Sequence, residues 1–305
     1  MTRVFNQVSA FADDVLTGLV AAYPEHVQRV FGGVVRATDS PDGEVAVVIG
    51  GGSGHYPAFS GWVGPGMAHA AVQGNVFASP SASQVYAVCR AAEKGGGVLL
   101  SYGNYAGDVL HFGQAAAKLR AEGLDVRILP VTDDIASGPV DARQLRRGVA
   151  GDLVVFKVAG AAAERGWDLD RVEAVARRAN DSTRSLGVAF DGCTMPGASE
   201  PLFTVPAGEM SIGLGVHGEP GVREVPMGSA TEIAQLMVEG VLAEQPERAE
   251  GGYTGRAAVL LNGLGTVQHE ELLIVFGEVA RLFDEAGVAI VQPEVGELMT
   301  SLDMA

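Results

Sequence analysis

The chain is poor in basic residues, and lysine is the scarcest of them. Among 305 residues, 21 are lysine or arginine and 37 are aspartate or glutamate, so the formal net charge is −16. The lysines are Lys94, Lys118 and Lys157. A nucleic-acid partner requires a basic surface that neutralises phosphates, so this composition argues against one. The Gly-Lys-Ser/Thr sequence of a P-loop occurs nowhere.

Cysteine and long apolar runs are scarce as well. Cys89 and Cys193 are far apart and have neither metal-binding nor redox spacing, so we expect no disulfide framework. No two of the six histidines have the spacing of a zinc site, and we expect no metal on this chain. No apolar run approaches the ~20 residues that cross a bilayer, and the first ten residues do not form a signal peptide. We therefore expect a cytoplasmic protein without a membrane partner.

Glycine, in contrast, is abundant, with 42 residues that punctuate short apolar runs. Such runs are typical of parallel strands that are buried on both faces. They predict strands at residues 44–49, 97–100, 126–131 and 153–158. Helical patterns lie between them, at 80–94 with Ser79 as the N-cap and at 111–122 before Gly123. This alternation indicates an α/β domain.

The second half of the chain has a different texture. An amphipathic helix at 168–181 acts as a connector, after which small and branched residues alternate. The pattern then predicts strands at 187–190, 211–216, 257–261 and 288–292, and helices at 232–243 and 270–286. We place a domain boundary near residue 183, which divides the chain into two α/β domains, 1–183 and 184–305.

The first segment that could carry chemistry is VIGGGSGHYP, at residues 48–57. Glycines at a strand's carboxyl end let the backbone turn sharply and approach a ligand. The segment does not match the dinucleotide-binding fingerprint or the P-loop, and His55 breaks the serine-hydrolase elbow. It is therefore either a tight turn without chemistry or a binding loop of another kind.

Two further glycine-rich loops each contain one ionisable group. In SYGNYAGDV (101–109), Asp108 precedes a helix and is either an N-cap or a catalytic carboxylate. In GLGVHGEPG (213–221), His217 lies between a strand and a turn. The pair Asp133-Asp134 follows the 126–131 strand, and for it we favour a capping or turn role.

Together these loops make the chain resemble the dihydroxyacetone kinase family, in its substrate-binding K subunit or domain. The matching stretches are GGGSGH (50–55), GWVGPGM (61–67), FASPSASQV (77–85), GVLLSYGNYAGDVLHF (97–112), VTDDIA (131–136), RRGVAGDLVVFKVAGAAAE (146–164), RSLGVAFDGCTMPG (184–197), MSIGLGVHGEPG (210–221) and LLNGLG (260–265). The resemblance covers nearly the whole chain. It implies two α/β domains with the ketose site between them, and a homodimer.

The resemblance also implies roles for individual residues. His217 would add to the substrate's ketone and form a hemiaminal, which would select ketoses over polyols because polyols have no carbonyl. His55 would hydrogen-bond the adduct oxygen, and Asp108 would accept the proton of the terminal hydroxyl. Backbone groups of the substrate-binding residues Gly52, Ser53, Gly54 and Gly103 would hold the other hydroxyls.

The chain departs from the family pattern at three positions. The family's common form has lysine where this chain has Gly103, and glutamate and histidine where it has Tyr56 and Phe59. The resulting form resembles a subgroup that acts on four-carbon ketoses such as D- or L-erythrulose, so we prefer these to dihydroxyacetone as substrates.

The family's ATP-using kinases have a separate helical nucleotide-binding domain, and nothing after residue 221 resembles it. We therefore expect a truncated portion or one subunit of a kinase, with ATP and Mg²⁺ on another domain or subunit and no cofactor on this chain. By itself the chain would bind a ketose but not phosphorylate it.

Two alternatives remain open. One is a non-catalytic ketose-binding regulatory homologue. The other is a serine hydrolase that uses Ser53, Asp108 and His217, which occur in a known triad order.

Overall fold

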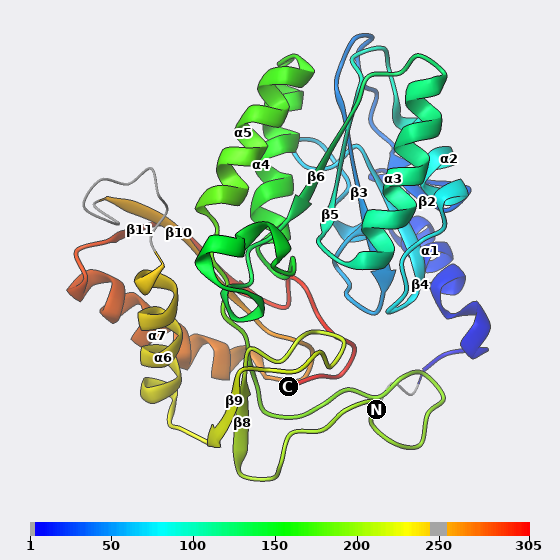
Figure 1. Cartoon of the computed structure of the whole chain (residues 1–305). Coiled ribbons are helices and arrows are strands. Elements are labelled where there is room, and N and C mark those ends of the chain that lie inside the picture. Colours follow the sequence, from blue (N-terminus) through cyan, green and yellow to red (C-terminus); the bar gives the residue numbers. More distant parts are fainter. Residues whose placement is uncertain (1–3, 245–254) are drawn as a thin grey trace. The chain divides into compact units, whose positions relative to one another are not determined.

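The computed structural model describes residues 4–244 and 255–305 (Figure 1). The chain packs as two compact units, and each is described by itself. The first unit contains residues 4–132 and 152–180, and the second contains 133–151 together with the described residues from 181 to 305. The division into domains at residue 183 stays a prediction. No helix among the described residues has the length and apolar character needed to span a membrane.

A six-stranded sheet forms the centre of the first unit, in the order β1-β2-β4-β3-β5-β6. Strands β4, β3, β5 and β6 run parallel, and β1 and β2 are antiparallel to their neighbours. The bounds are β1 Val27–Val30, β2 Gly33–Arg36, β3 Ala46–Ser53, β4 Ala70–Val76, β5 Val98–Gly103 and β6 Val126–Val131. The strands predicted at 44–49, 97–100 and 126–131 are confirmed.

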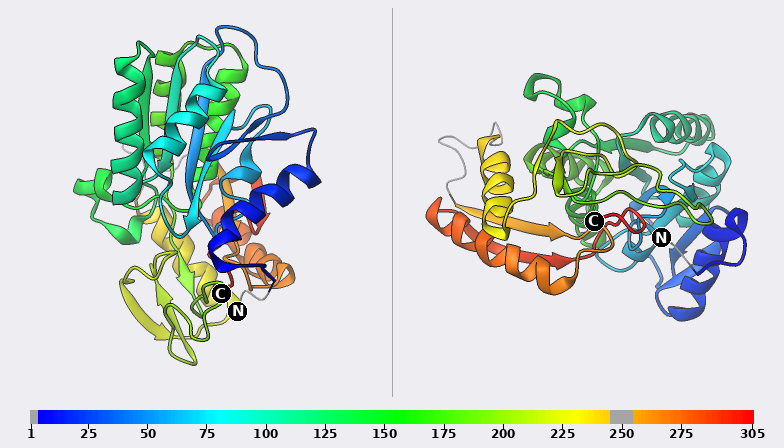
Figure 2. Two further views of the ribbon diagram at one scale, coloured as in Figure 1. Left: turned by 90° about the vertical axis from the view of Figure 1, so that its right-hand side faces the viewer. Right: turned by 90° about the horizontal axis from the view of Figure 1, so that it is seen from below.

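Helices flank this sheet (Figures 1 and 2). Side chains such as Val48 and Leu100 point to one face, where they form a buried core with Val88 of α2 and Phe112 of α3. Helix α4 packs against β3 and β5. The bounds are α1 Phe11–Ala22, α2 Ala82–Ala92, α3 Ala106–Ala121, α4 Asp152–Glu164 and α5 Leu169–Ser182, with 3-10 turns at Val8–Ala10 and Ser60–Trp62.

Two predictions for this unit are wrong: the strand at 153–158 and the N-cap at Ser79. The apolar run at 153–158 is not a strand but the first half of α4, whose buried residues recur with helical spacing. A short apolar run does not distinguish a buried strand from a buried helix, and the alanines that follow it favour the helix. Ser79 is not the N-cap of α2, because Ser81 occupies that position and forms a capping box with Gln84.

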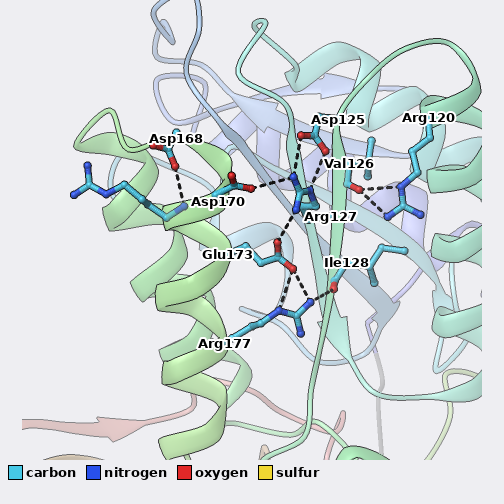
Figure 3. A network of polar contacts seen from close by, with 10 residues as sticks. Arg120, Asp125, Val126, Arg127, Ile128, Asp168, Asp170, Glu173 and Arg177 are labelled. Carbon is cyan, nitrogen blue, oxygen red and sulfur yellow. Dashed lines mark hydrogen bonds and ion pairs between the residues drawn. The ribbon is translucent and has the colours of Figure 1, made fainter.

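The outer edge of β6 is closed by arginine side chains (Figure 3). Arg120 donates to the Val126 carbonyl, and Arg177 donates to the Ile128 carbonyl. Arg127, on the same strand, pairs with carboxylates of Asp125, Asp170 and Glu173. Since an open strand edge invites pairing with another chain, these contacts protect the sheet.

The second unit contains two small sheets. Strands β7 Val188–Ala189, β8 Glu209–Ile212 and β9 Arg223–Pro226 are antiparallel, whereas β10 Arg256–Asn262 and β11 Ala289–Gly296 form a parallel pair. Helix α6 (Ala230–Ala243) packs against α7 (His269–Glu285), which packs on both strands of the pair. Short 3-10 helices span Ile135–Ser137 and Val140–Leu145. The elements predicted in this half are confirmed in type, with shifted ends, and the fold is mixed α/β.

An ionic cluster in which Arg36, Glu44 and His69 are buried lies at the amino ends of β3 and β4. The Arg36 guanidinium donates to Glu44 and Glu164, each at 2.6 Å. His69 Nδ1 accepts the N–H of Val47 at 3.1 Å, and its Nε2 lies 3.4 Å from a Glu44 oxygen. Burial and the Arg36 charge lower the pKa of His69, although Glu44 acts in the opposite direction. The imidazole is therefore neutral in the folded protein at neutral pH.

We predict that this histidine makes the fold sensitive to mild acid. As the pH falls below about 6.5, His69 becomes protonated in the unfolded chain but stays unprotonated in the folded chain. The free energy of unfolding therefore falls until the pH reaches the pKa of His69 in the folded state. Urea unfolding of the wild type between neutral and mildly acidic pH measures this decline. The His69→Asn variant keeps an acceptor for Val47 without titrating there and should show a smaller decline; an equal decline would contradict the assignment.

Candidate functional site

The glycine-rich loop after β3 places His55 in a buried position. His55 is 2% exposed, and its ring stacks on Phe77 with 5.1 Å between ring centroids and 20° between the planes. Gly54 has a φ of +100°, and a β-carbon there would lie 2.8 Å from the Phe77 ring. The conformation and the close approach both require glycine at this position. The loop therefore fixes the imidazole instead of leaving it on a mobile surface turn.

Ser53 and Gly52 connect the same loop to neighbouring backbone. The Ser53 hydroxyl donates to the Gly74 carbonyl at 2.6 Å and accepts from the Gln73 amide at 2.9 Å. A β-carbon on Gly52 would lie 2.8 Å from the Ala78 nitrogen. A nucleophilic serine requires a basic partner, and neither Gly74 nor Gln73 supplies one. These contacts favour a structural role for the Ser53 side chain over the hydrolase alternative.

Asp108 lies in the first turn of α3 and is 8% exposed. The N-cap of this helix is Tyr105, so the capping role considered for Asp108 is wrong. A helix amino terminus favours an ionised carboxylate. Burial, with a further contribution from the Asp108 charge, raises the pKa of the neighbouring Tyr102 to about 12. The Asp108 carboxylate is thus buried near Tyr102 in the first turn of α3.

The parallel sheet brings these residues to one edge. Strands β3 and β5 are adjacent and parallel, so their carboxyl ends lie side by side. The loop with His55 follows β3, and Gly103 is the buried last residue of β5, just before α3 with Asp108. Ligands of open α/β sheets bind at this edge.

Two residues that depart from the family pattern, Tyr56 and Phe59, follow the glycine loop, and Phe59 is part of the core. Phe59 is 4% exposed and packs on Trp62 and Phe156, with centroid distances of 6.0 and 6.3 Å. A β-carbon on Gly51 would overlap the Phe59 ring. Tyr56 is 45% exposed. The aromatic ring of Phe59 therefore packs against the backbone of the glycine loop at Gly51.

The loop that carries His217 belongs to the second unit and follows β8. Its turn is closed by backbone hydrogen bonds from Gly215 to Glu219 and from Gly218 to Gly215, at 2.9 and 3.0 Å. The Ser301 hydroxyl donates to the carbonyl of Val216, immediately before the histidine. The backbone of His217 is thus held on both sides.

Glu219 fixes the imidazole of His217. Its carboxylate lies 2.9 Å from Nδ1 and also accepts the backbone N–H of His217 at 3.0 Å. Burial opposes ionisation of Glu219, but its contacts with His217 outweigh burial and bring its pKa to about 2. An ionised carboxylate only accepts hydrogen bonds, so the Nδ1 that faces Glu219 carries a proton.

The sequence interpretation did not identify Glu219 as a functional residue. The signal was present in the spacing, because a carboxylate two residues beyond a histidine in a tight glycine turn can reach back to the ring. The prediction for Asp134 is confirmed, since its side chain accepts the Ala136 N–H as the N-cap of a 3-10 turn. Asp133 is fully buried and accepts from Val149 and Gly151, which connects two backbone segments.

Among residues 4–244 and 255–305, one trio has the spacing of metal ligands. Glu44, His69 and Glu164 place one ligand atom each within 4.8 Å of one another. Arg36 bridges the two carboxylates, so its guanidinium already supplies the positive charge. The trio lies at the amino ends of the strands, whereas His55 and Asp108 follow carboxyl ends. We assign this cluster a structural role.

Comparison with known proteins supports the sequence resemblance. The model of the Dak1 domain family matches residues 17–305. An L-erythrulose 1-kinase of Mycolicibacterium smegmatis is 61% identical over 305 residues, which are 100% of this chain and 53% of that protein. The chain therefore spans about half the length of this relative.

Solved structures agree with this comparison. The dihydroxyacetone kinase of C. freundii in complex with AMP-PNP and Mg²⁺ has a TM-score of 0.89 and 38% identity over 99% of this chain and 56% of that one. The dihydroxyacetone kinase operon co-activator DhaQ also has a TM-score of 0.89, with 32% identity over 96% of this chain and 89% of its own.

We predict that Ser53 supports the loop and is not a nucleophile. Ser53→Ala removes the donor to Gly74 and the acceptor of Gln73, so the free energy of unfolding should fall by about 1–3 kcal/mol. Urea denaturation measures the loss, with the exposed Ser199→Ala as the control. A fluorophosphonate probe should leave Ser53 unlabelled, and labelling there would restore the hydrolase alternative.

Proposed function

The chain belongs to the Dak1 domain family, and on this basis we propose that it is the ketose-binding part of a ketose kinase. The observation that carries the proposal is the contact between His217 Nδ1 and Glu219 at 2.9 Å. It turns the Nδ1–H toward a carboxylate, so Nε2 is the ring nitrogen that would attack a carbonyl carbon.

The proposed anchoring step is an addition to the ketone. The Nε2–carbon bond forms while the C=O π bond breaks, and the resulting oxyanion takes up one proton. The proton comes from solvent, and we assign its transfer to the oxyanion to His55. The alkylated imidazole is then cationic and still carries the Nδ1 proton, so the Glu219 carboxylate balances its charge. Glycerol has no carbonyl and would form no adduct.

The second proposed step activates the terminal hydroxyl. Asp108 would accept the hydroxyl proton as its oxygen attacks the phosphorus of the donor. Backbone groups of Gly52, Ser53, Gly54 and Gly103 would hold the remaining hydroxyls. Phosphoryl transfer depends mainly on positioning and charge neutralisation, so a covalent anchor that fixes the hydroxyl contributes directly to it.

We propose a four-carbon ketose, D- or L-erythrulose, in preference to dihydroxyacetone. Glycine replaces a long cationic side chain at position 103, which would leave room for one further carbon and its hydroxyl. The similarity to an L-erythrulose 1-kinase supports this choice.

We assign ATP and Mg²⁺ to a separate helical nucleotide-binding domain or subunit. The carboxylates of the single ligand-like trio in the described part of the chain are neutralised by Arg36, so these residues do not fit a Mg²⁺-nucleotide. The chain by itself would then bind the ketose without phosphorylating it. A homodimer and a place in the cytoplasm belong to the same proposal.

A second candidate is a ketose-binding regulatory homologue. The similarity to the co-activator DhaQ favours it, because that structure has the same TM-score as the kinase. Addition of a helical nucleotide-binding domain, MgATP and erythrulose discriminates the two: sugar phosphate forms with a kinase part, whereas a regulator binds the ketose without turnover.

We predict a covalent adduct on His217. Intact-protein mass spectrometry with dihydroxyacetone and with each erythrulose should show a gain of the full substrate mass, because a hemiaminal forms without loss of water. His217→Ala should abolish the adduct, while the exposed His269→Ala should retain it. Glycerol should give none. An adduct that has lost water, or one that survives in His217→Ala, would refute the assignment.

We further predict that Asp108 acts after anchoring. Asp108→Asn keeps the size of the side chain but removes its capacity to accept a proton, so the adduct should form as in the wild type. With the nucleotide-binding domain present, turnover should fall by about a hundredfold or more. Loss of the adduct would show instead that Asp108 serves binding, and unchanged turnover would exclude it as the base.

A further inference from the structure

Arg147 belongs to the second unit and contacts the His217 loop. Its side chain is 12% exposed. Its Nε and Nη2 lie 2.9 and 2.7 Å from Asp134 Oδ2. The same Nη2 donates to the carbonyl of Gly213, the first residue of the loop, at 2.8 Å. Nη1 lies 3.9 Å from Glu219 Oε2. One guanidinium therefore connects a buried carboxylate, the start of the loop and the partner of the histidine.

The base of this arrangement is itself fixed. Asp134 caps a 3-10 turn through its Oδ1, and its backbone N–H donates to the Arg147 carbonyl at 3.1 Å. The Arg147 N–H in turn donates to the Ser137 hydroxyl at 2.9 Å. The guanidinium thus extends from an anchored segment, so its donors are held in a constant direction.

We propose that Arg147 is a positioning residue for His217. The guanidinium holds the loop at Gly213 and keeps the Glu219 carboxylate facing Nδ1, so that the imidazole remains in the tautomer with its lone pair on Nε2. The importance of this for anchoring rests on the proposed function, but the effect on the tautomer does not. Arg147 does not reach the reacting nitrogen; it acts through Glu219.

The charges support this arrangement. Asp134, Arg147, Glu219 and His217 form a chain in which negative and positive groups alternate once the imidazole is alkylated. Arg147 beside Glu219 favours the ionised carboxylate, so the Nδ1 proton stays on the ring when the adduct forms. A lysine has a single ammonium group and cannot make the same set of fork-shaped contacts.

Gly215 provides an independent way to disturb the same contact. A β-carbon at this position would overlap both Glu219 Oε2 and Arg147 Nη1. Gly215→Ala therefore pushes the carboxylate or the guanidinium aside without removing either. Its φ is not in the left-handed region, so the substitution acts through this overlap and not through backbone conformation.

The test measures the tautomer of His217 directly. Nitrogen-15 NMR of the ligand-free chain, recorded well above the ordinary imidazole pKa of about 6.5, should show the proton on Nδ1 in the wild type. Arg147→Met and Gly215→Ala should shift the population toward the Nε2–H form, and Arg147→Lys should be intermediate. Adduct formation with erythrulose should weaken by about tenfold in Arg147→Met, since a charge-assisted contact is lost.

Arg146→Met is the matched control. Arg146 is adjacent, fully buried and paired with Glu244 at 2.7 and 2.8 Å, so its loss should lower stability but leave the His217 tautomer unchanged. If Arg147→Met folds and keeps the wild-type His217 spectrum, the inference is overturned. Should that variant not fold, Arg147→Lys and Gly215→Ala decide in the same way.

The two proposals fail separately. A changed tautomer in these variants, together with a wild type that never forms an adduct, would overturn the proposed function and leave the positioning role of Arg147 standing. An adduct on wild-type His217 with unaltered tautomers in all three variants would overturn the positioning role alone.

Discussion

The contact between His217 Nδ1 and Glu219 is the interaction on which the proposed chemistry of this chain depends. An imidazole attacks a carbonyl only when one ring nitrogen keeps its lone pair, and the ionised carboxylate decides which nitrogen that is. The close glycine turn, the Ser301 contact to Val216 and the Arg147 contact to Gly213 all hold this pair in place. The loop is thus a rigid support for one side chain.

The first unit also holds one histidine on a rigid loop, but through sheet topology and glycine packing. There the parallel order of β3 and β5 brings two loops to one sheet edge, and glycines allow close backbone approach around His55. Phe59 and Phe77 pack against these glycines and immobilise the loop. At the opposite ends of the strands, Arg36 pairs with the buried Glu44 and the exposed Glu164, so the charged groups there have a structural role.

Sequence reasoning succeeded where a local pattern has one structural solution. The 126–131 strand and the glycine loops were recognised because apolar runs and glycines at strand ends have a direct backbone meaning. It failed at 153–158, where a short apolar run suits a buried helix as well as a strand, and at Ser79, where another serine two residues later makes the cap. Glu219 was overlooked because its importance lies in one contact with the ring.

The mixed α/β class and the candidate residues His55, Asp108 and His217 were determined by the sequence itself, because they depend on residue type and on spacing along the chain. Only the tertiary structure decided that Ser53 forms hydrogen bonds with Gln73 and Gly74, that Phe59 is buried in the core, and that Arg147 pairs with Glu219. Arg147 and Glu219 are 72 residues apart in the numbering. Contacts of this kind are set by how loops from different elements pack, and side-chain packing over such separations has no local signature.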